Sequence, residues 1–182
     1  LGTLLSSRKK SMISRVGDLC LIAAFSGIYM IYGVQDFGHI FEVAQIKGNL
    51  LSNNTWIGWL VIFGAILKSA QFPFHTWLPD TMGAPTPVSA LMHAGIINGG
   101  GYLVVRLSPV LVHTLGALHM LAIVGALTAV YASMVMLSQT SVKRALAYST
   151  IAQMGFMLLQ CGLGAFHLAV LHLVAHSLYK GH

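Results

Sequence analysis

Charged side chains are scarce in this sequence. Only 8% of its 182 residues are charged, whereas about a quarter of the residues of a soluble domain are. Acidic residues are the rarest of these, with four Asp or Glu against ten Lys or Arg. Hydrophobic residues make up 56% of the chain, and the mean hydropathy is +0.77. This balance excludes an ordinary soluble domain and predicts an all-α polytopic membrane protein.

Cysteine and cofactor motifs are nearly absent as well. Cys20 and Cys161 both lie in apolar stretches, and two lone cysteines provide neither a disulfide framework nor a metal site. No flavin, nicotinamide or iron–sulfur motif occurs, so we expect no cofactor and no catalytic site in this chain. Basic residues are not interleaved with aromatic ones, so nucleic acid is not an expected partner. The apolar composition makes membrane lipid an expected partner.

Long apolar runs predict about six transmembrane helices. Their expected ranges are 16–34, 56–79 with an interruption near Pro73, from after Pro87 to 107, 110–137, 142–163 and 165 to the end. The loop over 35–55 is expected to carry a short amphipathic helix. The chain opens without methionine and stops within an apolar run, so we expect a piece of a longer protein.

Basic residues outside the predicted helices indicate the topology. The basic lead over residues 1–15 and the turn over 138–144 hold six Lys or Arg. Four spans separate the two segments, so both face the same side, which the positive-inside rule makes cytoplasmic. We therefore expect a multi-pass membrane protein with these two segments on the cytoplasmic side. The loops on the opposite side hold only Lys47 and, at a helix end, Arg106. Lys68 and Lys180 remain, and both are predicted inside the bilayer.

Lys68 follows a long apolar run and stands close to Pro73. Pro73 offers no N–H to the Ser69 carbonyl and crowds the preceding turn, so the helix should break or kink there. An intramembrane lysine beside a helix break suggests an ion path, because freed carbonyls and water solvate the charge. The alternative is a lysine at a helix end whose ammonium reaches the membrane surface.

Three polar residues share one face of the last predicted helix. His172, His176 and Lys180 are spaced four residues apart, which separates successive members by about 6 Å along the axis. Histidine titrates near neutral pH and a desolvated lysine can release its proton, so the row is suited to a proton relay. The alternative is a hydrogen-bonding face that only holds the helices together. No Cys, Asp or Glu accompanies the histidines, so a metal site is less expected.

Two further residues are candidates for the same path. His93 lies midway along the third predicted helix, although a lone buried histidine is more often structural. Asp18 opens the first predicted helix, where the helix dipole favours a carboxylate, and it could also pair with a nearby lysine.

Several other polar or small residues are interpreted as structural. The run Gly99 to Gly101 after Asn98 is expected to permit close helix contact. A polar stripe on the fifth predicted helix should face the bundle or a wet half-channel, and it consists of Tyr148, Ser149, Thr150 and Gln153. No role is assigned to four histidines near predicted helix ends: His75, His113, His119 and His167.

Four segments together resemble a known family. They are SRVGD (14–18), KSAQFPFHTWLPDTMGAPTPVSALMHAG (68–95), SVKRALAYSTIAQMGFM (141–157) and HLVAHSLYKGH (172–182). They are similar to the antiporter-like membrane subunits of respiratory complex I, multisubunit cation/proton antiporters and DAB-type inorganic-carbon uptake complexes. The resemblance implies a larger bundle with inverted repeats, in which 16–107 would end the first repeat and 108–182 would begin the second.

The resemblance also implies roles for individual residues. Lys68 matches the broken-helix lysine, whose glutamate partner would lie upstream of this chain. His93 matches the channel histidine of the next helix. Lys180 matches the central lysine that links two half-channels, with His172 and His176 on its approach. Asp18 matches an aspartate at the start of its helix.

The details HAGIINGGG and AHSLYKGH resemble the DAB membrane subunit more than complex I. That subtype implies a subunit coupling proton or sodium flow to CO2 or bicarbonate uptake. Its partner would be a large soluble carbonic-anhydrase-like subunit that holds the zinc. The alternative is a proton-translocating subunit of NADH:quinone oxidoreductase or of a cation/proton antiporter, partnered by other membrane subunits. A third possibility is a structural membrane subunit without transport.

Overall fold

The computed structural model describes residues 2–33, 37–46, 55–80 and 91–181, and this part of the chain contains helices and no strand. The prediction of an all-α fold is therefore confirmed. Two helices of the described part, Ser7–Ile31 and Leu115–Leu137, are long and apolar enough to cross a membrane by length and composition. The count of six spans goes beyond this and stays a prediction.

The first helix, α1 (Gly2–Tyr32), begins well before the predicted start at Val16. The predicted helix start is therefore wrong, because residues 3–15 contain neither proline nor glycine and their serines and basic residues tolerate a helix. The assignment of residues 1–15 to the cytoplasmic side stays a prediction. This part of α1 packs against α5 (Trp77–Asp80). The next helix, α2 (Phe37–Ile46), confirms the short helix expected in the loop.

The second predicted helix is broken, as expected. It consists of α4 (Trp56–Lys68) and the short α5, with an irregular segment between them. The break begins directly after Lys68, one turn before Pro73. Lys68 therefore lies at the C-terminal end of α4, where the helix dipole favours a cation.

The third predicted helix has two kinds of turn. Its described part starts with a π-helical segment, η2 (Met92–Ile96), and continues as α7 (Asn98–Arg106). The sequence pattern does not predict the π-helical segment. Pro85 and Pro87, after which this helix is predicted to begin, belong to residues 81–90, which lie outside the described residues.

The fourth predicted helix starts later than expected. A separate turn, α8 (Ser108–Leu111), precedes α9 (Leu115–Leu137), and the backbone leaves the helical region at Thr114, with φ −119° and ψ 64°. The last two helices, α10 (Val142–Gly162) and α11 (Phe166–Gly181), lie close to their predicted ranges. Gly164 turns the chain between them with φ +79°.

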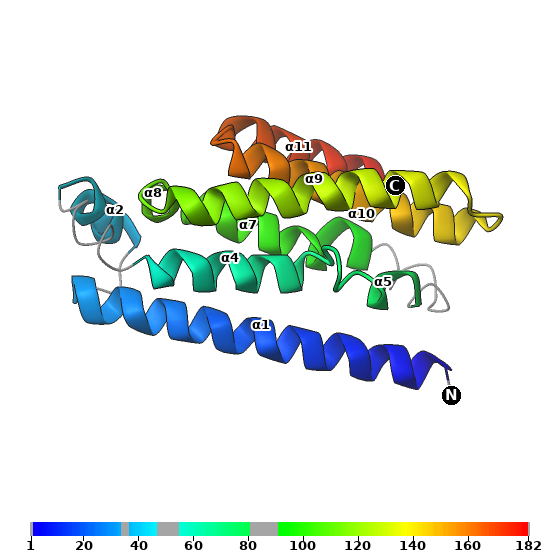
Figure 1. The fold of residues 1–182 in the computed structure, drawn as a ribbon, viewed down its shortest axis with the longest axis horizontal. Helices are drawn as coiled ribbons and strands as arrows, with labels where there is room; N and C mark the ends of the chain where they lie inside the picture. Colours follow the sequence, from blue (N-terminus) through cyan, green and yellow to red (C-terminus); the bar gives the residue numbers. More distant parts are fainter. Residues whose placement is uncertain (1, 34–36, 47–54, 81–90, 182) are drawn as a thin grey trace.

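The helices form a layered bundle (Figure 1). α1 lies along α4 and α5 at one edge, and α11 lies at the opposite edge, beyond α9 and α10. α9 and α10 pack so closely that a methyl group at Gly155 would lie 2.8 Å from the backbone nitrogen of Ala129. α7 and η2 contact α11, and α7 also contacts α4. This arrangement brings the broken helix of the first half against the helices of the second half.

Candidate functional site

The break between α4 and α5 is held by side-chain hydrogen bonds. Pro73 has no N–H for the Ser69 carbonyl, and this carbonyl instead accepts a hydrogen bond of 3.2 Å from Gln71 Nε2. The Phe72 N–H donates to Thr128 Oγ1 of α9 at 3.1 Å. Two backbone groups of the break are thus satisfied without continuing the helix, one of them by a helix of the second half.

The residues at the start of the break are buried within the bundle, as is His75, whereas Phe72, Pro73 and Thr76 are exposed. Ser69, Ala70 and Gln71 have no exposed surface, and Ala70 adopts φ +53°, a left-handed conformation that costs an L-residue about 1–2 kcal/mol. Backbone strain of this kind persists only where the surrounding structure enforces it, and it is often found at functional sites. The surrounding helices therefore hold this segment in its non-helical conformation.

Lys68 and Asp18 form an ion pair beside the break. Lys68 Nζ lies 2.5 Å from Asp18 Oδ1, and the side chains are 32% and 42% exposed. Asp18 lies inside α1, so the interpretation of this residue as a helix-dipole partner is wrong and the alternative of pairing with a lysine is confirmed. Lys68 stands at a helix end, as the alternative of an ammonium reaching the membrane surface requires, but its ammonium contacts a carboxylate.

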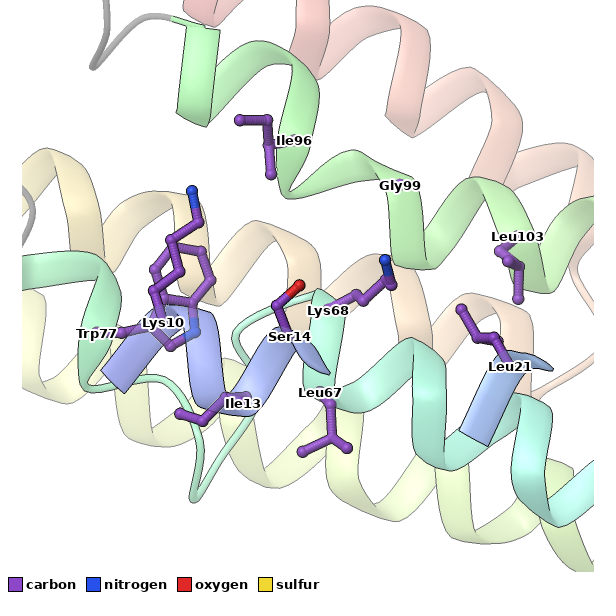
Figure 2. Close-up of a pocket in the computed structure, with 10 residues that line it drawn as sticks. All are labelled: Lys10, Ile13, Ser14, Leu21, Leu67, Lys68, Trp77, Ile96, Gly99 and Leu103. Atoms are coloured by element: carbon purple, nitrogen blue, oxygen red, sulfur yellow. The ribbon is translucent and has the colours of Figure 1, made fainter. Parts of the chain in front are cut away.

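A cavity of about 230 Å³ opens next to this pair. Figure 2 shows Lys10, Trp77, Ser14 and Lys68 around it, with Ser14 between the two lysines in this view. The other lining residues are aliphatic apart from Gly99. Lys10 Nζ lies 5.5 Å from the centre of the Trp77 ring, a cation–π contact. The lining of the cavity thus contains two lysines, Lys10 near the start of α1 and Lys68 at the end of α4.

The second candidate cluster lies between α10 and α11. The rings of His172 and His176 are 6.5 Å apart, and His176 is only 6% exposed. Both histidines line a cavity of about 550 Å³ together with Ser149 and Gln153 of α10. Ser149 and Gln153 of the polar stripe thus share this cavity with the two histidines, while Tyr148 of the stripe lies against His75. The wet half-channel stays a prediction. The side chain of Lys180, the third member of the row, lies outside the described residues.

His93 belongs to η2, and its side chain also lies outside the described residues. π-helical turns inside α-helices are rare and are frequently found at functional sites. The backbone thus gives the His93 region an unusual geometry, while the contacts of the imidazole stay a prediction.

His75 is a residue that the sequence interpretation misses. It lies in the break, is 4% exposed, and its Nδ1 has no hydrogen-bond partner among the described residues. Its ring stacks on Phe72 and lies 5.1 Å from the ring of Tyr131 and 6.4 Å from that of Tyr148. The signal that could have identified it is its position two residues after Pro73. A break in a helix leaves backbone groups without their helical partners, and a histidine at this point adds a polar side chain beside them.

The glycine run after Asn98 allows close packing at the break, as expected. A methyl group at Gly100 would overlap Ser69 Oγ and lie 2.6 Å from the Ala65 carbonyl oxygen, and one at Gly101 would overlap Met157 of α10. A methyl group at Gly99 would meet no atom within 4 Å. α7 therefore approaches α4 and α10 through the second and third glycines of the run.

In the described part of the chain, a bundle of helices thus places a lysine and a carboxylate side by side at a broken helix. The model of the family described as NADH:quinone oxidoreductase/Mrp antiporter, TM, matches residues 3–182. The chain belongs to this family of membrane proteins.

Individual relatives fall in three branches of the family. The chain is 53% identical over 171 residues to the probable inorganic carbon transporter subunit DabB1 of Halothiobacillus neapolitanus, covering 92% of this chain and 31% of the relative. It is 42% identical over 173 residues to NADH-ubiquinone oxidoreductase chain 5 of Cryptococcus neoformans, covering 94% and 26%. The Mrp complex from Dietzia sp. has a similar fold, with TM-score 0.85, 33% identity, and 97% and 20% covered. The chain thus spans about a third or less of the length of these relatives.

Proposed function

We propose that this chain is part of the membrane subunit of an ion-coupled inorganic-carbon uptake complex in a bacterial cytoplasmic membrane. The observation that favours this subtype is the 53% identity to a probable inorganic carbon transporter subunit, against 42% to a complex I subunit. Uptake of CO2 or bicarbonate would be driven by a proton or sodium flow through the chain. A large soluble zinc-containing, carbonic-anhydrase-like subunit would be the partner.

The Lys68–Asp18 pair is the observation that supports ion conduction. An ammonium with its counter-ion holds its proton, and movement of the carboxylate away would make release of the proton easier. His75 lies in the same break, seven residues after this lysine, and His93 follows on the next helix. In our proposal the proton passes from Lys68 through these imidazoles toward His172, His176 and Lys180 in the second half.

Water in the two cavities would complete the path. The cavity at Lys68 has two lysines and a serine hydroxyl in its lining, and the cavity at α11 has serine and glutamine side chains facing the histidines. Polar groups at this spacing can hold water molecules that bridge gaps longer than one hydrogen bond. The residues then act by positioning and exchanging protons, and zinc chemistry would belong to the partner.

A second candidate is a proton-translocating subunit of an NADH:quinone oxidoreductase or of a cation/proton antiporter. The 42% identity to a chain 5 subunit and the similarity to the Mrp complex favour it. Its partners would be the other membrane subunits of such a complex. The conducting residues would be the same, so the two candidates differ in what the ion flow drives.

Loss of the gene separates the two candidates. Under the first proposal the deletion strain requires high CO2 for growth, the full-length gene relieves this requirement, and the Lys68→Ala gene does not. Lys143→Ala is the matched control, because Lys143 is exposed near the start of α10 and should have no effect. If the deletion instead abolishes NADH-driven respiration and creates no requirement for high CO2, the first proposal is wrong and the second is supported.

A further inference from the structure

Asn98 links two helices that are far apart in the sequence. Its Nδ2 donates a hydrogen bond of 2.8 Å to Ser177 Oγ in α11. Ser177 Oγ donates its own proton to the Leu173 carbonyl at 2.8 Å. The hydroxyl therefore acts as donor within α11 and as acceptor from Asn98, which uses its hydrogen-bonding capacity in both directions. Asn98 is 5% exposed, so this bond is largely shielded from water.

The two residues lie next to the elements that carry the proposed ion path. Asn98 is the first residue of α7 and follows the π-helical η2, which contains His93. Ser177 is adjacent to His176 and lies one turn before Lys180 in α11. α11 packs against η2, α7 and α10. The hydrogen bond thus joins the histidine-bearing segment of the first half to the histidine-bearing helix of the second half.

The π-helical turn makes this contact sensitive to geometry. The N–H of Ile97 bonds to the Met92 carbonyl five residues earlier, at 3.3 Å, so the helix is locally wider there. Such a turn has poorer backbone geometry than an α-helix and depends on its tertiary neighbours. A side-chain hydrogen bond directly after it fixes how far α11 can rotate or slide past η2.

We propose that Asn98 is a positioning residue that acts through Ser177. The bond would hold α11 in register with η2, so that His176 stays in the cavity facing α10 and in line with the path from the first half. An amide donor does not titrate, so it would keep this register while the histidines around it gain and lose protons. This inference rests on the proposed ion conduction. It adds that the Asn98–Ser177 hydrogen bond aligns the two halves of the proposed path.

The test uses the full-length complex in membrane vesicles and measures cation flux together with its solvent deuterium isotope effect. Asn98→Leu keeps the side-chain volume without the donor, and Ser177→Ala removes the acceptor. Each should lower flux by about three- to tenfold, the ratio that corresponds to one net hydrogen bond. The isotope effect should rise, because proton transfer between the misaligned η2 and α11 becomes rate-limiting. Ser177→Thr keeps the hydroxyl and should retain flux.

Two further variants make the assignment specific. The double variant Asn98→Leu with Ser177→Ala should conduct no worse than either single variant, since both remove the same bond. Ser138→Ala is the control, because Ser138 Oγ makes a similar bond within its own helix, to the Val135 carbonyl, and is exposed. This control should conduct as the wild type does.

Fully additive losses, or an unchanged isotope effect with a reduced amount of assembled complex, would overturn the inference, because both indicate general support of the fold. Wild-type flux in Asn98→Leu would do the same. If Lys68→Ala also conducts normally, the proposed ion path itself fails. If Lys68→Ala abolishes flux while Asn98→Leu is normal, only the positioning role of Asn98 is wrong.

Discussion

Lys68 Nζ lies 2.5 Å from Asp18 Oδ1, at the point where α4 ends and the broken segment begins. The lysine is far from Asp18 in the sequence, and α1 and α4 bring the two together along their shared contact. A lysine in an apolar helix thus has a counter-ion, and it sits beside backbone that is not helical. The proposed ion path through Lys68 rests on this combination.

Removal of the counter-charge should impair conduction more than stability. Asp18→Asn keeps the size of the side chain, and because the pair is partly exposed we expect a loss of only about 1 kcal/mol in stability. Flux should fall by about tenfold or more, since proton-exchanging groups contribute at least that much when they are properly placed. Vesicle flux normalised to assembled complex measures this. Glu42→Gln is the control, since Glu42 is exposed on α2, and normal flux in Asp18→Asn would contradict the role of the pair.

His75 should be part of the path although the sequence pattern does not single it out. His75→Phe keeps an aromatic ring against Phe72 and Tyr131 but removes both nitrogens. We expect assembly to be preserved and flux to fall by about tenfold or more, because a relay loses a proton-carrying group. The same change at exposed His119 of α9 should leave flux intact. If the two variants conduct equally well, His75 has only a packing role.

The hydrogen bond from Phe72 to α9 should stabilise the break. Thr128→Val has nearly the same shape but cannot accept from the Phe72 N–H, which is partly buried. A net hydrogen bond contributes about 0.5–1.5 kcal/mol, and the melting temperature of the complex should fall accordingly. Thr140→Val, at an exposed position after α9, is the control. An unchanged melting temperature in Thr128→Val would show that water or another group replaces the threonine.

Two neighbouring glycines should respond in opposite ways to the same substitution. Gly100→Ala places a methyl group against Ser69 and the Ala65 carbonyl, which should cost about 1–3 kcal/mol and push α7 away from the break. Gly99→Ala meets no atom within 4 Å and should be neutral or stabilising by up to about 1 kcal/mol through helix propensity. Thermal unfolding of both variants measures the difference. Equal effects would contradict the close approach of α7 to α4.

Local sequence signals predict some parts of this fold well. α10 and α11 lie close to their expected ranges, because a polar turn precedes the apolar run of α10 and Gly164 separates it from the apolar run of α11. The interruption of the second helix follows from Pro73, since a missing N–H acts locally. The start of α1 is missed because basic residues indicate a membrane surface as readily as they permit a helix.

The parts that depend on distant contacts are harder to predict. Pairing of Asp18 with a nearby lysine is only one of two alternatives in the sequence, and Lys68 is not identified as that lysine, because nothing local places α1 beside α4. The π-helical η2 has no pattern of its own, and its neighbour Asn98 finds its partner 79 residues later. His75 is missed because burial of the break comes from α9 and α10. The family roles of His93 and Lys180 stay predictions.

Lys68→Arg tests the central proposal most directly. Arginine stays charged and can keep the ion pair with Asp18, but it does not release its proton under physiological conditions. The measurement is cation flux through the assembled full-length complex in vesicles, with Lys143→Arg as the matched control. Conduction through the lysine predicts that Lys68→Arg assembles normally and loses flux while Lys143→Arg conducts fully. Wild-type flux in Lys68→Arg would contradict a proton path through this residue.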